Sequence, residues 1–285
     1  MKKYFRTKKG VFVYAEENTK LCKQFIESSL YQEVDIPFIT VSVPVYKSKG
    51  LLKRAVKYIL RQTYPHFELI VVSDADPDKS IKEIRQIEDS RLKIIELEEN
   101  IGRYAVDHLV VTELANGTHW VPVDSDDWCA ENYLSSLVNI LRSKPESDVV
   151  FAAQYIQENY RKRKQRVRNW DGTDTLIWHA HMSALWRRDF VVEMNLTNPN
   201  FRIGWDSIVT SVPWIVGNVE YTQSAFYHRV KRHNSLTSNK ETCFGSEHRN
   251  RVKMYITQLW KEIVKNKNDV QKIKQILNRS RYEQY

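Results

Sequence analysis

The sequence has few cysteines and glycines, and it has no long hydrophobic run. Its three cysteines, Cys22, Cys129 and Cys243, are far apart and odd in number, so neither a zinc site of paired cysteines nor a disulfide framework is expected. The eight glycines form neither a dinucleotide-binding Gly-x-Gly-x-x-Gly nor a P-loop. No segment is apolar enough to span a membrane, and Val11 to Ala15 is too short for the core of a signal peptide. These absences predict a reducing, cytoplasmic setting.

What the sequence does have is an excess of positive charge. Lysine and arginine number 44 against 35 aspartates and glutamates, which gives a net charge of +9. This charge suits an anionic ligand, an anionic membrane surface or nucleic acid, and it does not choose among them. With 285 residues, the chain can form one large core or one domain with additions.

Strand and helix patterns alternate between residues 37 and 145. Strands are predicted at 38–45, 67–72, 92–97 and 118–123, and helices at 50–62, from about 79 to 88, at 103–114 and at 130–141. This alternation with short links predicts right-handed β-α-β units and therefore an α/β fold with a mostly parallel sheet flanked by helices.

The flanking segments are less regular. A strand at 11–14 and a helix at 19–30 are predicted in the first 36 residues. Later strands are expected at 148–157, 176–178, 182–186 and 219–227, with helices at 191–194 and from 206 to 215. Six of the eight residues from Arg161 to Arg168 are basic, and we expect them on a hairpin.

Three carboxylates follow the strand at 118–123 within four positions: Asp124, Asp126 and Asp127. They therefore lie where a strand of an open α/β sheet ends, which is where such sheets bind ligands. Charges this close repel one another unless a cation lies among them, and a hard divalent ion with oxygen ligands, Mg²⁺ or Mn²⁺, fits this pattern and also binds phosphate. The alternative is an acidic loop in which Asp127 caps the next helix.

Four segments, in this order, resemble the inverting glycosyltransferases of family 2, which have the GT-A fold. They are Val43-Pro44-Val45-Tyr46, the segment Val71-Val72-Ser73-Asp74-Ala75-Asp76-Pro77-Asp78, Asn100-Ile101-Gly102, and Asp124-Ser125-Asp126-Asp127. The resemblance covers roughly residues 37 to 227. It implies transfer of a sugar from a nucleoside-diphosphate donor, UDP being the commonest, to a hydroxyl of a glycan, lipid-linked or glycoprotein acceptor.

The resemblance also implies roles for single residues. The donor would contact Pro44, Val45, Tyr46, Asp74, Arg103, Asp124 and Ser125, with Asp74 at the base. Asp126 would be the main ligand of the Mn²⁺ or Mg²⁺, Asp124 would face the ribose and the ion, and Asp127 would orient the loop. Ser73, Ala75 and Tyr104–Asp107 depart from the family pattern, which weakens any inference about the nucleotide.

An inverting transfer needs a base that takes the proton of the acceptor hydroxyl. Asp206 stands where the family has this base, and Trp205 replaces the acid that usually precedes it. We therefore expect Asp206 to be catalytic, rather than a simple helix cap, and Trp205, Trp170 and His181 to contact the acceptor.

A late basic cluster resembles the family segment near the diphosphate. His228 or His233 would complete the metal shell, and Arg229 or Arg232 would pair with phosphate oxygens. The sequence does not choose between the members of each pair, and a solvated basic loop is the alternative.

The chain is expected to divide into an extension (1–36), a GT-A domain (37–245) with a nucleotide-binding half (37–128) and an acceptor-binding half (129–245), and a helical tail (246–285). Apolar residues recur along the tail at helical spacing, from Val252 to Val264, and basic residues occupy its other face. We expect the tail to pack on the domain. The alternatives are peripheral contact with the inner face of the membrane and, if the apolar stripe is exposed, a homodimer.

Other classes fit the sequence less well. A nucleotidyltransferase would have a glycine-rich loop near residues 43–50, which is absent. A nucleic-acid-binding protein would explain the charge, but no module of interleaved basic and aromatic residues is visible, so no nucleic acid is expected. A catalytically silent, glycan-binding relative is a third alternative, and the presence of Asp124, Asp126 and Asp206 argues against it.

Overall fold

The computed structural model of the protein describes residues 3–7, 12–15, 31–33, 36–158, 160–177, 183–231 and 242–281. The chain forms two compact units, Met1–Pro37 and Phe38–Tyr285. The first is an antiparallel sheet in the order β2-β1-β3, made of β1 (Lys3–Thr7), β2 (Phe12–Ala15) and β3 (Tyr31–Glu33). The strand expected at 11–14 overlaps β2, and the helix expected at 19–30 lies outside the described residues.

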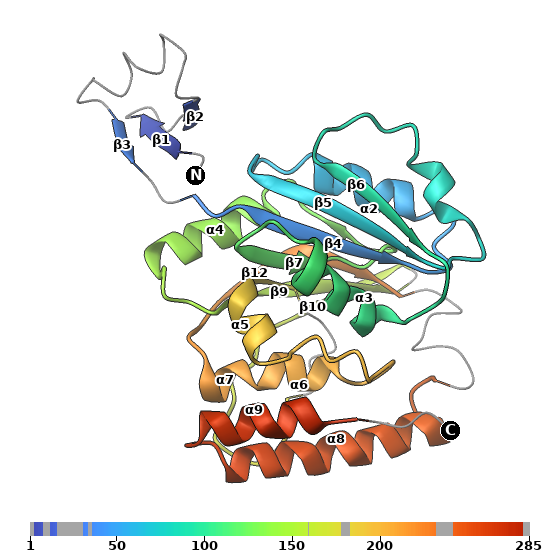
Figure 1. The fold of residues 1–285 in the computed structure, drawn as a ribbon, viewed down its shortest axis with the longest axis vertical. Helices are drawn as coiled ribbons and strands as arrows, with labels where there is room; N and C mark the ends of the chain where they lie inside the picture. The colour runs from blue at the N-terminus through green and yellow to red at the C-terminus, as the bar shows by residue number, and fades with distance from the viewer. Residues whose placement is uncertain are drawn as a thin grey trace. The chain divides into compact units, whose positions relative to one another are not determined.

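The second unit is built on one large sheet in the order β6-β5-β4-β7-β11-β9-β12-β8, with β10 paired to β9 (Figure 1). Its strands are β4 (Ile39–Val45), β5 (Phe67–Asp74), β6 (Leu92–Leu97), β7 (His119–Pro122), β8 (Trp128–Cys129), β9 (Val149–Glu158), β10 (Arg161–Gln165), β11 (Ala184–Arg187) and β12 (Val219–Val230).

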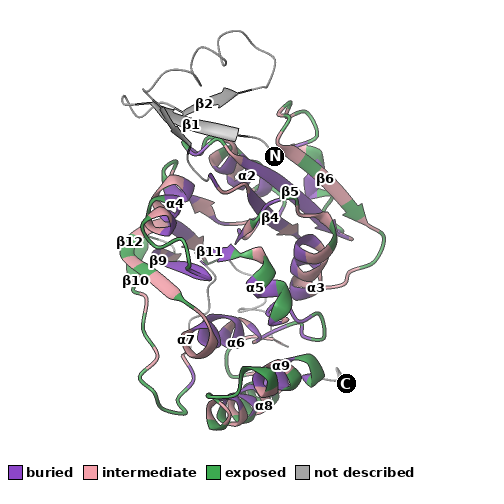
Figure 2. Cartoon of the chain, turned by 60° about the vertical axis from the view of Figure 1, so that its left-hand side comes forward, coloured by how far each residue is buried: buried purple, intermediate pink, exposed green. Residues whose placement is uncertain are grey.

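The first half of this sheet is parallel, as expected. Strand β4 runs parallel to both β5 and β7, and β5 runs parallel to β6, so these strands end at the same edge. All eight residues of β5 and nearly all of β4 are buried (Figure 2), because helices cover both faces. Gly117 permits the close approach of β7 to β4, since a Cβ atom there would lie 2.5 Å from the backbone nitrogen of Thr40.

The second half is mixed. Strand β11 is antiparallel to both of its neighbours, β7 and β9, whereas β12 runs parallel to β9. The basic stretch forms the expected hairpin, with β10 antiparallel to β9. Of the short strands expected at 176–178 and 182–186, the second corresponds to β11, Leu176 and Ile177 are not in a strand, and residues 178–182 lie outside the described part.

The helices are α2 (Leu52–Leu60), α3 (Arg103–Leu109), α4 (Tyr133–Ser143), α5 (Arg188–Glu193), α6 (Asp206–Ser211), α7 (Pro213–Val216), α8 (Glu247–Lys265) and α9 (Val270–Arg279). The helix expected up to residue 88 is wrong: only a 3₁₀ turn, η1 (Ser80–Glu83), forms. The reason is that the Asp76 carboxylate binds the Ser80 N–H at 2.7 Å, and the preceding residue, Lys79, has a left-handed backbone. The helix expected from 206 to 215 is divided at Pro213, which has no N–H to donate.

The tail forms α8 and α9, which lie side by side beyond α6 (Figure 1). The opposite face of α8 is exposed (Figure 2). The face toward the core carries five buried apolar residues: Val252, Ile256, Leu259, Trp260 and Ile263. The apolar stripe is therefore covered within the chain, as expected for a packed tail, and it offers no exposed face for the homodimer. Among the helices of the described residues, none combines the length and the apolar character needed to cross a bilayer.

Candidate active site

The acidic loop joins β7 to β8 at the edge where the parallel strands end. Carboxylate oxygens of Asp124, Asp126 and Asp127 lie within 4.8 Å of one another. Asp124 and Asp126 are partly exposed, whereas Asp127 is buried. A group of carboxylate oxygens is the donor set that Mg²⁺ and Mn²⁺ prefer, so these residues fit a divalent cation with Asp124 and Asp126 facing the solvent.

Asp127 fixes this loop to β12. Its carboxylate accepts the Tyr227 hydroxyl at 2.9 Å and the Val230 N–H at 2.7 Å. The Tyr227 oxygen in turn accepts the N–H of Asp124 at 3.0 Å. Burial, together with the nearby charge of Asp126, raises the pKa of Asp127 to about 7. Asp127 therefore orients the loop.

Arg103, the first residue of α3, forms an ion pair with Asp124. The Arg103 Nε–H also donates a hydrogen bond to the carboxylate of Asp107, one helical turn later, at 3.2 Å. Asp107 is fully buried and accepts the Ser42 hydroxyl at 3.3 Å, and Ser42 accepts the indole N–H of Trp120 at 2.9 Å. A chain of hydrogen bonds thus fixes the guanidinium that forms the ion pair with Asp124. The sequence indicated Arg103 but gave no sign of its support.

Asp206 is the first residue of α6, and Tyr104 holds it in place. The Tyr104 hydroxyl donates to the Asp206 carboxylate at 3.2 Å and accepts the Asp206 N–H at 3.0 Å. Because Arg103 and Tyr104 are consecutive, α3 presents one side chain to the acidic loop and the next to Asp206. Sequence reasoning noted Tyr104 only as a departure from the family pattern and missed this role.

The loops after β4 and β5 form the side of the site where the nucleoside is expected. Asp74 is buried, and its carboxylate accepts the N–H groups of Ile101 at 2.7 Å and Gly102 at 2.9 Å. Gly102 has a φ of 89°, a conformation that side chains disfavour. Asp74 therefore shapes the Asn100–Gly102 turn that leads into Arg103. Its contact with a base stays a prediction.

Asp76 binds two loops together, a role that the sequence did not reveal. Its carboxylate accepts the N–H of Lys47 at 2.7 Å, next to Tyr46, whose side chain is 42% exposed. Burial acts to raise the pKa of Asp76. Hydrogen bonds from Ser80, Lys47 and Asp78 outweigh this effect and lower the pKa. Ser125 of the acidic loop is bound to the loop after β4, because its hydroxyl lies 2.5 Å from that of Ser48.

A cavity of about 280 Å³ opens beside these loops. Its lining is mixed polar, cationic and apolar: Ser73, Ala75, Asp76, Lys79, Lys82 and Leu97 among others. Pro44 and Val45 end the neighbouring strand β4.

The structure places several expected site residues elsewhere. Trp205 is fully buried, donates its indole N–H to the Leu196 carbonyl at 2.9 Å and stacks on Phe201, so no acceptor can stack on it. Trp170 is partly buried against Trp260 of α8, with its indole N–H bound to the Thr173 carbonyl.

His228 is buried in an aromatic stack rather than grouped with the aspartates. Its ring lies 3.5 Å from that of Trp128, nearly parallel to it, and 5.0 Å from that of Tyr155. Burial, helped by Lys162, lowers the pKa of His228 to about 4. In the described part of the chain, the only cluster of candidate metal ligands consists of Asp124, Asp126 and Asp127, so the metal contact expected of His228 is not seen.

Of the remaining basic cluster, the charge of Arg229 acts against the rise in the pKa of Asp127 without cancelling it. His181, Arg232 and His233 lie outside the described residues.

The fold and the site define a GT-A nucleotide-sugar-transferase architecture, and solved structures share it. The structure of Staphylococcus aureus TarS residues 1–349 in complex with UDP-GlcNAc matches with a TM-score of 0.66 at 20% identity, covering 84% of this chain and 70% of that one. The Pyrobaculum calidifontis mannosyltransferase PcManGT, in complex with GDP-Man and Mn²⁺, matches with a TM-score of 0.54 at 18% identity, covering 85% of this chain and 68% of that one.

Residues 40–205 match the family model described as glycosyl transferase family 2, so the chain belongs to this family. It is 34% identical to the glycosyltransferase GlyG of Streptococcus pneumoniae over 41% of this chain and 39% of that one. It is also 34% identical to the putative teichuronic acid biosynthesis glycosyltransferase TuaG of Bacillus subtilis, over 32% and 36% of the two chains. The chain thus spans about two fifths of these relatives.

Proposed function

We propose that this protein is an inverting glycosyltransferase that moves a sugar from a nucleoside-diphosphate donor, UDP-linked, to a hydroxyl of a glycan acceptor. The observation that carries this proposal is that α3 connects the two halves of such a reaction. Arg103 contacts the acidic loop, where a diphosphate and its metal would bind, and Tyr104 holds Asp206, the expected base. Lipid-linked and glycoprotein acceptors are alternatives within the same chemistry.

In this mechanism Asp206 accepts the proton of the acceptor hydroxyl while the oxygen attacks the anomeric carbon and the bond to the diphosphate breaks. Tyr104 keeps the carboxylate oriented toward the acceptor. Negative charge grows on the departing phosphate oxygens, and Arg103, released from Asp124, donates hydrogen bonds to them. Arg229 adds positive charge beside the loop.

Asp124 and Asp126 would hold the Mn²⁺ or Mg²⁺, while Asp127 stays bound to Tyr227 and β12. A divalent cation there would stabilise the charge of the leaving diphosphate. The name of TuaG, which refers to teichuronic acid biosynthesis, supports a glycan acceptor in polysaccharide assembly.

A panel of nucleoside diphosphates tests the donor site directly. We expect UDP to raise the melting temperature only when Mn²⁺ is present, because the diphosphate and the aspartates both need the cation. Asp126→Ala should abolish this shift, whereas Asp189→Ala, which removes an exposed carboxylate on α5, should retain it. A shift with RNA and none with any diphosphate would refute the proposal and favour the nucleic-acid alternative.

A further inference from the structure

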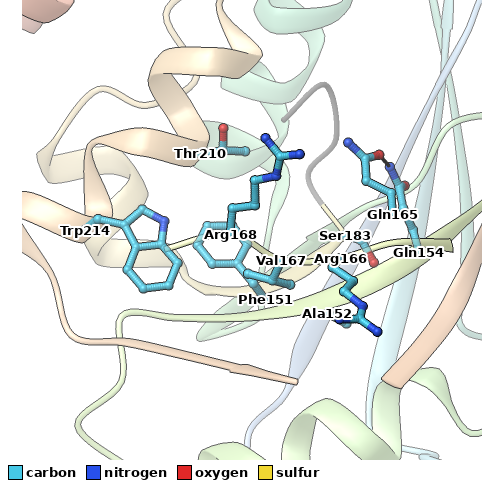
Figure 3. A pocket seen from close by; sticks show the side chains of 10 residues that line it. All are labelled: Phe151, Ala152, Gln154, Gln165, Arg166, Val167, Arg168, Ser183, Thr210 and Trp214. Atoms are coloured by element: carbon cyan, nitrogen blue, oxygen red, sulfur yellow. Dashed lines mark hydrogen bonds between the residues drawn. The ribbon is translucent and has the colours of Figure 1, made fainter. Parts of the chain in front are cut away.

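A second pocket lies within residues 151–214, the part of the chain expected to bind the acceptor. It is formed by strand β9, the segment after β10, and helices α6 and α7, and it encloses about 30 Å³. Figure 3 shows Trp214 at one side, Gln154 and Gln165 at the other, and Arg168 between them. The enclosed space is small, so it fits one substituent of a larger ligand that lies across the surface.

This pocket is one helical turn from the proposed base. Thr210 lines it and donates its hydroxyl hydrogen to the carbonyl of Asp206 at 2.9 Å. Residues four apart share a helix face, and their Cα atoms are separated by about 6 Å along the axis. The pocket therefore adjoins the helix that begins at Asp206.

The pocket has a strongly cationic rim. Arg166 and Arg168 line it, and the adjoining strand β10 carries four exposed cations: Arg161, Lys162, Arg163 and Lys164. Within the described part of the chain, none of these four forms an ion pair. Glu158 is already paired with Lys231, so it does not neutralise these four cations.

Its uncharged groups suit a carbohydrate. Gln154 is 3% exposed, and its amide nitrogen donates to Gln165, while its amide oxygen is buried and has no hydrogen-bond partner among the described residues. Such an orphaned acceptor needs a donor from a ligand or from water, and a sugar hydroxyl supplies one. Ser183 and Thr210 add hydroxyls, and Trp214 adds an aromatic wall.

We propose that this pocket and the β9–β10 hairpin bind the acceptor, and that the acceptor is a glycan polymer with regularly spaced negative charges, phosphate or carboxylate. The pocket takes one anionic or hydroxyl-bearing substituent beside Arg166 and Arg168. Arg161 and Arg163, which lie on the same face of β10 as Gln165, bind the charges of the following units. This inference rests on the proposed function, because it identifies the acceptor of the same reaction.

The experiment measures binding of three polymers to the full chain by calorimetry without donor: poly(glycerol phosphate), polygalacturonate and neutral dextran. We expect binding of at least one anionic polymer and none of dextran, and we expect the affinity to fall as salt is added. The two anionic polymers distinguish a phosphate acceptor from a carboxylate acceptor.

The variant Arg166→Gln/Arg168→Gln should weaken this binding by at least about tenfold, since two charge-assisted contacts are lost. The matched control, Arg251→Gln/Lys265→Gln, removes the same charge from the exposed face of α8 and should bind like the wild type. Melting temperatures of both variants establish that they are folded.

Equal binding of dextran, or equal loss in both variants, would overturn the proposal. So would binding to vesicles containing phosphatidylglycerol without binding to either anionic polymer, because the hairpin would then recognise a membrane. Failure of the proposed function is seen separately, as the absence of UDP binding with Mn²⁺ in a protein that still binds the polymer.

Discussion

At the scale of single residues, the most informative contact is that between Tyr104 and Asp206. The tyrosine hydroxyl both donates to the carboxylate and accepts from the backbone of the same aspartate. This double contact fixes where the carboxylate points, and in the proposed mechanism it orients the base.

Asp206→Asn should therefore abolish proton transfer without disturbing the helix start. We expect the rate of sugar transfer to fall by between about 100-fold and about 10,000-fold, because an amide cannot act as the base. Donor binding, measured by the melting shift with UDP and Mn²⁺, should persist. Tyr104→Phe should cause a smaller loss, since it removes only the orientation. Loss of UDP binding in Asp206→Asn would show that the residue is structural.

Ala75 gives a prediction about stability. It has a φ of 49°, in the left-handed region, at a position where the family pattern has glycine. Glycine at this position removes the strain of the left-handed backbone, about 1–2 kcal/mol. Its greater conformational freedom in the unfolded chain reduces the gain in stability by roughly 0.5–1 kcal/mol. We expect Ala75→Gly to raise the free energy of unfolding by up to about 1 kcal/mol, as measured by urea titration. A clear loss of stability would contradict this reasoning.

Trp205 and Asp206 show where prediction from single residues fails. Both were expected in the site because Asp206 stands where the family has its base and Trp205 directly precedes it. Consecutive helical residues point about 100° apart, however, and of these two only Trp205 faces the core, while Asp206 meets Tyr104. Which of the two does so depends on the packing of Phe201 and Leu196, and no local pattern reveals it.

At the scale of elements, the stack of Trp128, His228 and Tyr155 joins β8, β12 and β9 next to the acidic loop. Its central imidazole is neutral at physiological pH, because burial holds the pKa of His228 near 4. The unfolded chain takes up a proton at a pH near 6.5, whereas the folded chain does so only near pH 4. The contribution of the neutral His228 to the free energy of unfolding is therefore complete above pH 6.5, and it is lost as the pH falls from 6.5 to 4.

His228→Phe should flatten this acid dependence. Phenylalanine keeps a ring against Trp128 but binds no proton, so the variant should lose less stability than the wild type between pH 7 and pH 5, by about 1–2 kcal/mol. Urea unfolding of both proteins at the two pH values, without added metal, measures the difference. Parallel losses in the two proteins would mean that His228 is not the responsible group.

The elements themselves were predictable to different degrees. Strands β4 and β5 have alternating or continuous apolar patterns and are almost entirely buried, so the sequence was sufficient to predict them. Strand β6 was also predicted, although none of its residues is fully buried. The segment after β5 was misread because the Asp76 carboxylate binds the Ser80 N–H and also the N–H of Lys47, a residue far away in the sequence, and these contacts hold a turn in place of a helix. Likewise, the antiparallel direction of β11 depends on its place between β7 and β9.

At the scale of the whole molecule, the tail is part of the core of the second unit. Trp260 of α8 is fully buried, whereas Met254 of the same helix is 73% exposed. Trp260→Ala should lower the free energy of unfolding by about 3–5 kcal/mol, because it leaves a large cavity. Met254→Ala should change it by less than about 0.5 kcal/mol. Chemical denaturation distinguishes the two, and similar values would mean that the tail contributes little.

The general plan of the site was also predictable at this scale, because carboxylates after parallel strands meet at one edge of the sheet. The support beneath it was not, since Asp107, Ser42 and Trp120 come from three elements and only the folded chain brings them together. The sequence therefore indicated which groups could react, and the structure added what holds them.

Arg103 and Tyr104 share a single peptide bond between them. In the proposed reaction, the arginine that meets the phosphate and the tyrosine that holds the base are therefore carried by one stretch of backbone. A substitution that shifts the start of α3 acts on the donor side and the acceptor side of the site at once.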